Sequence, residues 1–190
     1  MLLLVGLGNP GSNYTNTRHN IGFKIIDAIN AHFKLSKQKP KFKGLLTTGN
    51  IDEKKIYAIK PLTFMNNSGT AIKELIDYFK IDAKDVFVFH DDMDIDFGKI
   101  KAKFGGSSAG HNGIESIDKF IGKDYSRVRI GIGHPKQKKK VNNHVLEDFK
   151  EDEEEKINDI TDNIVKQLPT LIKKKIDLFS SKVNQDLNGI

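Results

Sequence analysis

Short apolar runs alternate along this chain with longer segments in which apolar residues recur every three or four positions. Three of the runs have the length and composition of buried strands: 2–5, 86–89 and 128–130. Three of the longer segments carry an apolar stripe on one helix face, beginning at Ile21, Ile72 and Ile114. Alternation of strands and helices predicts an α/β fold, with a twisted, mixed β-sheet flanked by helices in three layers.

The remaining segments complete this prediction. Residues 45–48 and 56–59 resemble a hairpin joined by the loop 50–53, and residues 99–104 alternate as a strand. Residues 34–43 read as a basic connector. From Glu151 onward we predict two helices, separated at Pro169. We expect one domain over residues 1–190, with the C-terminal helices from about 151 packed on it, because this length suits a single core.

Composition excludes several classes of protein. The chain contains no Cys, which excludes disulfides and thiolate chemistry. Its apolar runs are far shorter than a membrane span needs. We therefore expect a cytoplasmic protein that does not enter membranes.

The charge is unevenly distributed. The chain has 31 Lys and Arg against 25 Asp and Glu, a net charge of +6. Residues 147–155 contain seven acids and one Lys, so the rest of the chain carries 30 − 18 = +12. Such a charge attracts polyanions, nucleic acid above all. The alternative, that AT-rich coding adds Lys without function, explains the composition equally well.

Two motifs suggest ligands that their context does not support. Residues 6–11 match the dinucleotide fingerprint G-x-G-x-x-G, but a polar stretch separates them from the first helical stripe, whereas a pyrophosphate needs the helix to begin at the glycines. Residues 92–96 have the spacing of a calcium loop, yet Phe97 and Lys103 stand where that loop needs Gly and Glu.

Several polar residues follow predicted strands or precede predicted helices. They are Asn9, His19, Asn66, Asp91, His111 and Asn112. One His, one carboxylate and several amides suffice for hydrolysis of an ester by water, because imidazole takes a proton near neutral pH, a carboxylate orients it and amides hold a carbonyl. Each of these residues taken alone is also typical of a loop.

Six blocks in order resemble bacterial peptidyl-tRNA hydrolase. They are Gly6-Leu7-Gly8-Asn9-Pro10-Gly11, Tyr14 with Thr17-Arg18-His19-Asn20, Pro61-Leu62-Thr63-Phe64-Met65-Asn66, His90-Asp91-Asp92-Met93-Asp94, Gly110-His111-Asn112-Gly113, and residues 127–135. The resemblance covers residues 2 to about 150. It implies one α/β domain that cleaves the ester between a peptide and the terminal ribose of tRNA.

The resemblance also implies roles for individual residues. His19 would activate water, and Asp91 would orient His19. Asn9, Asn66 and Asn112 would hold the substrate and position the water or the oxyanion, Met65 would pack against the base, and Tyr14 would lie in the loop lining the cleft. Lys103 and Arg129 would grip the tRNA 5′ phosphate.

Four lysines form a basic loop that is a candidate for tRNA contact: Lys136, Lys138, Lys139 and Lys140. The partner is then peptidyl-tRNA. We expect a monomer that uses no metal and no cofactor, because an aminoacyl ester is already activated. Activity should rise through roughly pH 6–7 as one imidazole loses its proton.

Some readings remain open. Ala109 stands where many relatives have Gly, and a positive φ there would be strained. His90 reads as structural, and His111 and His134 as supports of their loops. The runner-up function is a metal-dependent phosphoesterase or nuclease whose ligands are His90, Asp91, Asp92 and Asp94. A third is an RNA-binding module without catalysis, although the chain lacks the series of aromatic residues on which single-stranded bases stack.

Overall fold

Seven strands form one mixed sheet in the computed structural model, which describes residues 1–135 and 141–188. They are β1 (Leu2–Gly6), β2 (Lys39–Lys41), β3 (Gly44–Ile51), β4 (Lys54–Pro61), β5 (Val86–Asp92), β6 (Ile100–Phe104) and β7 (Ser126–Gly131). Their order is β2-β3-β4-β1-β5-β7-β6. The central strands β4, β1, β5 and β7 run parallel, and the pairs β2–β3, β3–β4 and β6–β7 are antiparallel.

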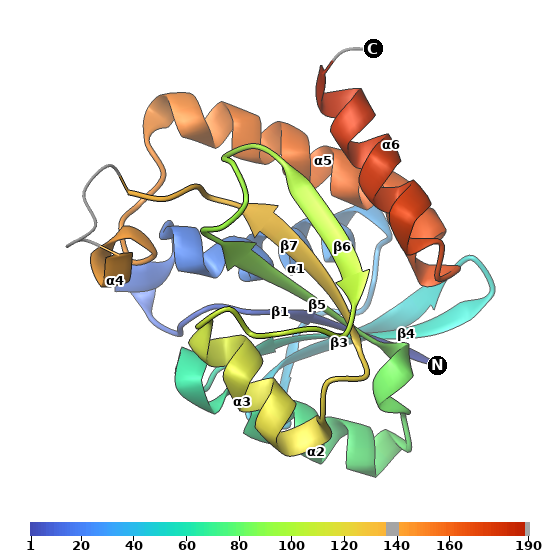
Figure 1. Cartoon of the computed structure of the whole chain (residues 1–190). Helices are drawn as coiled ribbons and strands as arrows, with labels where there is room; N and C mark the ends of the chain where they lie inside the picture. Colours follow the sequence, from blue (N-terminus) through green and yellow to red (C-terminus); the bar gives the residue numbers. More distant parts are fainter. Residues whose placement is uncertain (136–140, 189–190) are drawn as a thin grey trace.

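Helices cover both faces of the sheet (Figure 1). The helices are α1 (Ile21–His32), α2 (Ser68–Phe79), α3 (Asn112–Ile121), α4 (Val141–His144), α5 (Glu151–Ile172) and α6 (Ile176–Asn188). Short 3₁₀ turns occupy Ser12–Tyr14, Arg18–Asn20, Met65–Asn67 and Ala83–Asp85. One apolar core lies between the sheet and α1, α5 and α6, and a second lies between the sheet and α2 and α3. The predicted three-layer α/β fold is confirmed.

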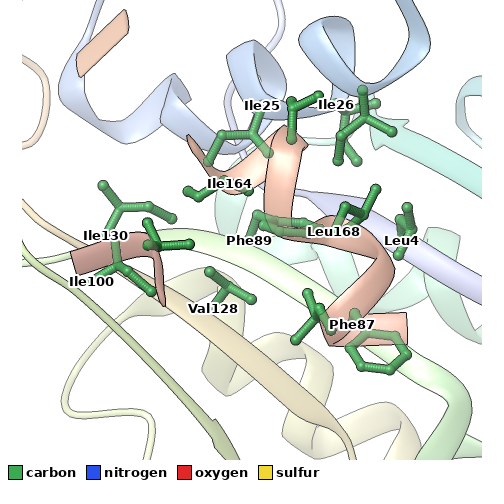
Figure 2. Close-up of a cluster of buried hydrophobic side chains, with 14 of the residues drawn as sticks. Leu4, Ile25, Ile26, Phe87, Phe89, Ile100, Val128, Ile130, Ile164 and Leu168 are labelled. Atoms are coloured by element: carbon green, nitrogen blue, oxygen red, sulfur yellow. The ribbon is translucent and has the colours of Figure 1, made fainter. Parts of the chain in front are cut away.

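The pleat of the sheet decides which core each side chain enters. Phe87 and Phe89 of β5 pack with Ile25 of α1 and Ile164 of α5, as Figure 2 shows. Val88, between the two phenylalanines, joins the α2–α3 core. Successive residues of a strand point to opposite faces, so this alternation continues into the polar end of β5.

A close approach between α1 and the strands sets where the site forms. A Cβ on Gly22 would collide with the backbone of Leu7 and Phe89. Only glycine therefore lets α1 lie this close to β1 and β5. The 3₁₀ turn Arg18–Asn20 directly precedes α1, and the same contact brings this turn against the end of β5.

Three element predictions need correction. Asn50 and Ile51 belong to β3, where they pair with Lys55 and Lys54, so the hairpin turn is shorter than predicted. The predicted connector 34–43 contains the edge strand β2. The predicted break at Pro169 does not occur, since α5 continues to Ile172.

Packing explains why Pro169 does not end α5. Proline removes one backbone hydrogen bond, but it lies in the last turn of the helix. The neighbouring Leu168, Leu171 and Ile172 are fully buried, and ending the helix earlier would withdraw these side chains from the core. Within residues 1–135 and 141–188, no helix combines the length and apolar character needed to cross a membrane.

Candidate active site

A cavity of about 360 Å³ opens where β5 ends and α3 begins. Six of the residues predicted to act on the substrate line it together: Asn9, His19, Met65, Asn66, Asp91 and Asn112. They come from five separate segments of the chain. The fold therefore assembles the predicted group in one place, at the carboxyl end of a parallel strand, where open sheets bind ligands.

The centre of the cavity is a contact between His19 and Asp91. The Nδ1 atom of His19 lies 2.9 Å from both carboxylate oxygens of Asp91. An ionised carboxylate can only accept hydrogen bonds, so Nδ1 carries the proton and donates it. The lone pair of the neutral ring is then on Nε2, where it can accept a proton from water.

His111 is a second histidine bound to the same carboxylate. Its Nε2 atom lies 3.0 Å from Oδ1 of Asp91. Its Nδ1 atom accepts the backbone N–H groups of Gly113 and Ile114, which caps α3. Because Nδ1 acts as an acceptor, the proton of the neutral ring is on Nε2, and Nε2 donates to Asp91. The sequence places His111 among the polar candidates for ester hydrolysis and otherwise favours a loop-supporting role, so its contact with Asp91 was not predicted.

These contacts shift the pKa values of the pair in opposite directions. Burial opposes ionisation of Asp91, but the charges and hydrogen bonds of His19 and His111 outweigh it and lower the pKa of this carboxyl far below its usual range. Burial also lowers the pKa of His19, but the charge of Asp91 and its hydrogen bond prevail and raise it above the ordinary histidine value. The pair is thus a fixed carboxylate beside an imidazole of enhanced basicity.

His90 packs against His111 and is not among the described residues that line the cavity. Its Nδ1 donates to the backbone oxygen of Asp91 at 2.7 Å, and its Nε2 is buried with no hydrogen-bond partner among the described residues. Burial, together with the charge of His111, holds the pKa of His90 well below the ordinary value. This neutral, buried ring, packed edge-to-face against His111, is consistent with the predicted structural role.

Amide groups hold the loops around the cavity. The side-chain oxygen of Asn9 accepts the backbone N–H of Met65 at 2.8 Å, and Asn20 pairs with the backbone of Asn9 through both of its amide atoms. The first contact uses the side-chain oxygen of Asn9 as an acceptor. Among the described residues the NH₂ group of Asn9 makes no hydrogen bond, so it can donate to a ligand. Asn66 and Asn112 border the cavity near it.

Arg18 anchors another part of the wall and was not predicted. Its guanidinium donates to the backbone oxygens of Glu147 and Asp148 and to the carboxylate of Glu153. The backbone N–H of His19 donates to the backbone oxygen of Val145, and Val145 lines the cavity together with Leu146. The burial of Arg18 beside His19 was not predictable from the sequence, because both residues follow a polar loop, where charged side chains are expected to be exposed.

Three other predicted residues lie outside the cavity wall. Tyr14 packs edge-to-face against Phe64, at 6.4 Å between ring centroids, and Phe64 lines the cavity. Lys103 and Arg129 line a separate groove of about 460 Å³ between β6 and α6. The basic loop of Lys136, Lys138, Lys139 and Lys140 lies outside the described residues.

The proposed ligands of the metal-dependent alternative are not brought together. His90 donates to a backbone oxygen, Asp92 binds Arg129, and Asp94 contacts the exposed His134 at 2.9 Å. Within the described part of the chain, the potential ligands that do converge are His19, Asp91 and His111, with atoms within 4.8 Å of one another. A metal on Nε2 of His111 would force its proton onto Nδ1, against two N–H donors, so this group does not fit an ion as arranged.

Comparison with known proteins identifies the family. The family model described as peptidyl-tRNA hydrolase matches residues 3–189. The peptidyl-tRNA hydrolase of Pelagibacter ubique (strain HTCC1062) is 72% identical over 184 residues, covering 97% of this chain and 99% of that protein. That of Bartonella quintana (strain Toulouse) is 46% identical, with 97% and 96% covered.

A solved structure agrees with these sequences. The crystal structure of peptidyl-tRNA hydrolase from Acinetobacter baumannii matches with a TM-score of 0.90 at 34% identity, covering 97% of this chain and 94% of that one. The match includes the strands and helices that build the cavity, since it spans almost the whole chain. This chain belongs to the peptidyl-tRNA hydrolase family.

Proposed function

We propose that this protein hydrolyses the ester between the peptide and the 3′-terminal ribose of peptidyl-tRNA, which releases tRNA for reuse. The observation that carries the proposal is the His19–Asp91 contact of 2.9 Å inside a cavity, in a chain of this family. His19 is the general base, Asp91 orients it, and the attacking group is water. No covalent intermediate and no metal are required, because the aminoacyl ester is already an activated acyl group.

The reaction needs two proton transfers through His19. Nε2 of His19 takes a proton from water while the water oxygen attacks the ester carbonyl carbon. Asp91 stabilises the imidazolium that forms. As the tetrahedral intermediate collapses, the carbon–oxygen bond to the ribose breaks, and Nε2 returns the proton to the leaving ribose oxygen. The products are a tRNA with a free terminal hydroxyl and a peptide carboxylic acid, which releases its proton to solvent and becomes a carboxylate.

The amides supply binding and charge stabilisation. Asn9, Asn66 and Asn112 hold the peptidyl group and position the water or the developing oxyanion, because amide N–H groups stabilise negative charge on a carbonyl oxygen. Met65 packs against the base. Tyr14 acts through Phe64, which it contacts at the cavity mouth.

Recognition of tRNA is assigned to cations outside the cavity. Lys103 and Arg129 grip the 5′ phosphate, a feature of an end rather than of a sequence, which suits an enzyme that accepts many tRNAs. The basic run at Lys136, Lys138, Lys139 and Lys140 adds contacts to the backbone. The protein acts as a monomer in the cytoplasm, where its substrate arises during translation.

Released tRNA is the readout that tests this function. The protein is incubated with N-blocked aminoacyl-tRNA and with free aminoacyl-tRNA, each with and without EDTA. We expect hydrolysis of the blocked substrate in both conditions, and we expect His19→Ala to remove nearly all turnover while tRNA binding persists. His32→Ala, a matched change at the end of α1 and outside the cavity, should retain activity. Complete loss in EDTA, or turnover by His19→Ala, would contradict the mechanism.

A further inference from the structure

Asp92 has a structural role that the hydrolytic mechanism does not use. It directly follows Asp91 at the end of β5, and only 8% of it is exposed. A buried carboxylate needs a partner to offset its desolvation. Asp92 has two: Oδ2 accepts Nε–H of Arg129 at 2.7 Å, and Oδ1 accepts the backbone N–H of Asp94 at 2.9 Å.

Because of the pleat of β5, the side chains of Asp91 and Asp92 contact different residues. Consecutive residues of a strand point to opposite faces, so the carboxylates of Asp91 and Asp92 bind different partners, although both residues line the cavity. Arg129 pairs in register with His90, two residues before Asp92, which puts the side chains of Arg129 and Asp92 on the same face. One strand end thus supports the catalytic pair on one face and a cation on the other.

The contact occupies Arg129 in a particular way. Arg129 reaches Asp92 through Nε alone, and no other hydrogen bond or ion pair of Arg129 occurs within residues 1–135 and 141–188. Both terminal Nη groups therefore keep their donors. The planar guanidinium can present these two nitrogens to a phosphate while a carboxylate holds it from the side.

Other cations face the same groove. Lys101 lies opposite Arg129 in the β6–β7 register, and Lys103 follows two residues later on the same face of β6. Within the described part of the chain, neither lysine makes an ion pair. Among the described residues, four cations line the groove, Lys99, Lys101, Lys103 and Arg129, with one carboxylate, Asp177. Even with Asp92 bound to Arg129, positive charge is in excess, so the groove still attracts an anion.

We propose that Asp92 is a positioning residue that holds Arg129 in the orientation that binds the 5′ phosphate of tRNA. This inference rests on the proposed function, which assigns that phosphate to Lys103 and Arg129. An arginine that is already ordered loses less conformational freedom on binding, and its Nη groups meet the phosphate without rearrangement. The carboxylate thus improves recognition of an anion, although its own charge opposes the anion.

The test compares two forms of deacylated tRNA, one with its 5′ phosphate and one without, by measuring the Kd of each at fixed salt. We define the Kd ratio as the Kd of the tRNA without its 5′ phosphate divided by the Kd of the tRNA with it. This ratio isolates the phosphate contact from hydrolysis and from contacts to the rest of the tRNA. In Arg129→Ala the ratio should fall toward one. In Asp92→Ala we expect it to fall about three- to tenfold, the effect of leaving one long side chain unordered. In Asp92→Ala/Arg129→Ala no further fall is expected.

The control is the variant Asp94→Asn. Asp94 is a neighbouring carboxylate whose side chain contacts the exposed His134. The Kd ratio of this variant should equal that of the unchanged protein. Asp92→Asn, which can still accept one hydrogen bond, should lower the ratio less than Asp92→Ala and replaces it if thermal unfolding shows that Asp92→Ala has not folded. An unchanged ratio in a folded Asp92 variant, with a reduced ratio in Arg129→Ala, overturns the inference. An unchanged ratio in Arg129→Ala refutes the phosphate clamp and this inference with it, and leaves the hydrolytic function to the His19 test.

Discussion

At the residue scale, the pH dependence of hydrolysis should report the pKa of His19. The base form of His19 exists only above this pKa, and Asp91 raises it. Activity should therefore rise with pH around a midpoint above the pKa of a free imidazole, about 6.5. The measurement is kcat/KM for an N-blocked aminoacyl-tRNA as a function of pH.

The matched variant for this prediction is Asp91→Asn. It removes the charge that raises the pKa of His19, so the rise should move to lower pH, and the maximal rate should fall by about 10²–10⁴-fold because the imidazolium loses its counter-charge. A rise at unchanged pH in Asp91→Asn would mean that another group sets the profile.

His111 should contribute to the rate and to stability through different atoms. Asn is a good N-cap, so His111→Asn should keep the cap of α3 but lose the hydrogen bond to Asp91. We expect kcat to fall by about tenfold, with the free energy of unfolding close to that of the unchanged protein. His111→Ala should lose about a further 1 kcal/mol of stability with the cap. Equal kcat in His111→Asn and the unchanged protein would show that the contact is not used.

The sequence predicted the site through short motifs, and it failed where a role depends on geometry. His19 and Asp91 stand in recognisable blocks, and the structure puts them in contact. The second partner of Asp91 was missed because the Gly-rich block before α3 explains a histidine equally well as a loop residue. The separate partners of Asp91 and Asp92 depend on the pleat, which becomes informative only once the packing of β5 is known.

At the element scale, the loop before α3 contains a residue in a strained conformation. Ala109 has φ +48°, a left-handed value that costs a residue with a Cβ more than it costs glycine. The positive φ on which the expected strain depends is thus observed. Ala109→Gly should raise the free energy of unfolding by up to about 1 kcal/mol, because relief of strain exceeds the added entropy of the unfolded chain.

Chemical denaturation measures this change. The control is Ala28→Gly within α1, where φ is ordinary for a helix and the same substitution should lower stability by about 1 kcal/mol. The same Ala→Gly change should thus raise the free energy of unfolding at position 109 and lower it at position 28. If Ala109→Gly destabilises the protein as Ala28→Gly does, the left-handed backbone at Ala109 is not a source of strain.

Element type was predictable where the pattern was strong, and element bounds were not. The stripe of α1 and the apolar run of β5 identify a helix and a strand directly, and both are observed. Propensity gave the wrong result at Pro169 and in the segment 34–43. Burial of the neighbours of Pro169 keeps α5 intact, and pairing with β3 orders the Lys-rich edge strand. Both are tertiary effects that act beyond the local sequence.

At the scale of the whole molecule, charge is separated along the chain. Acidic residues gather at the start of α5, where Glu153 binds Arg18 and the first turn carries four acids. Negative charge stabilises a helix N-terminus. The remaining surface has an excess of positive charge, which includes the cations of the groove between β6 and α6. The acidic run therefore serves the fold and leaves the basic surface available for RNA.

The salt dependence of tRNA binding should separate net charge from specific contacts. Each phosphate that a Lys or Arg neutralises releases a counterion and steepens the fall of log K with log salt. Lys103→Ala should therefore reduce the slope by about 1. Lys55→Ala removes the same charge from β4, which three strands separate from β6, and should change the slope little. Equal slopes for the two variants would mean that the general charge of the protein, and not a phosphate site on β6 and β7, holds the tRNA.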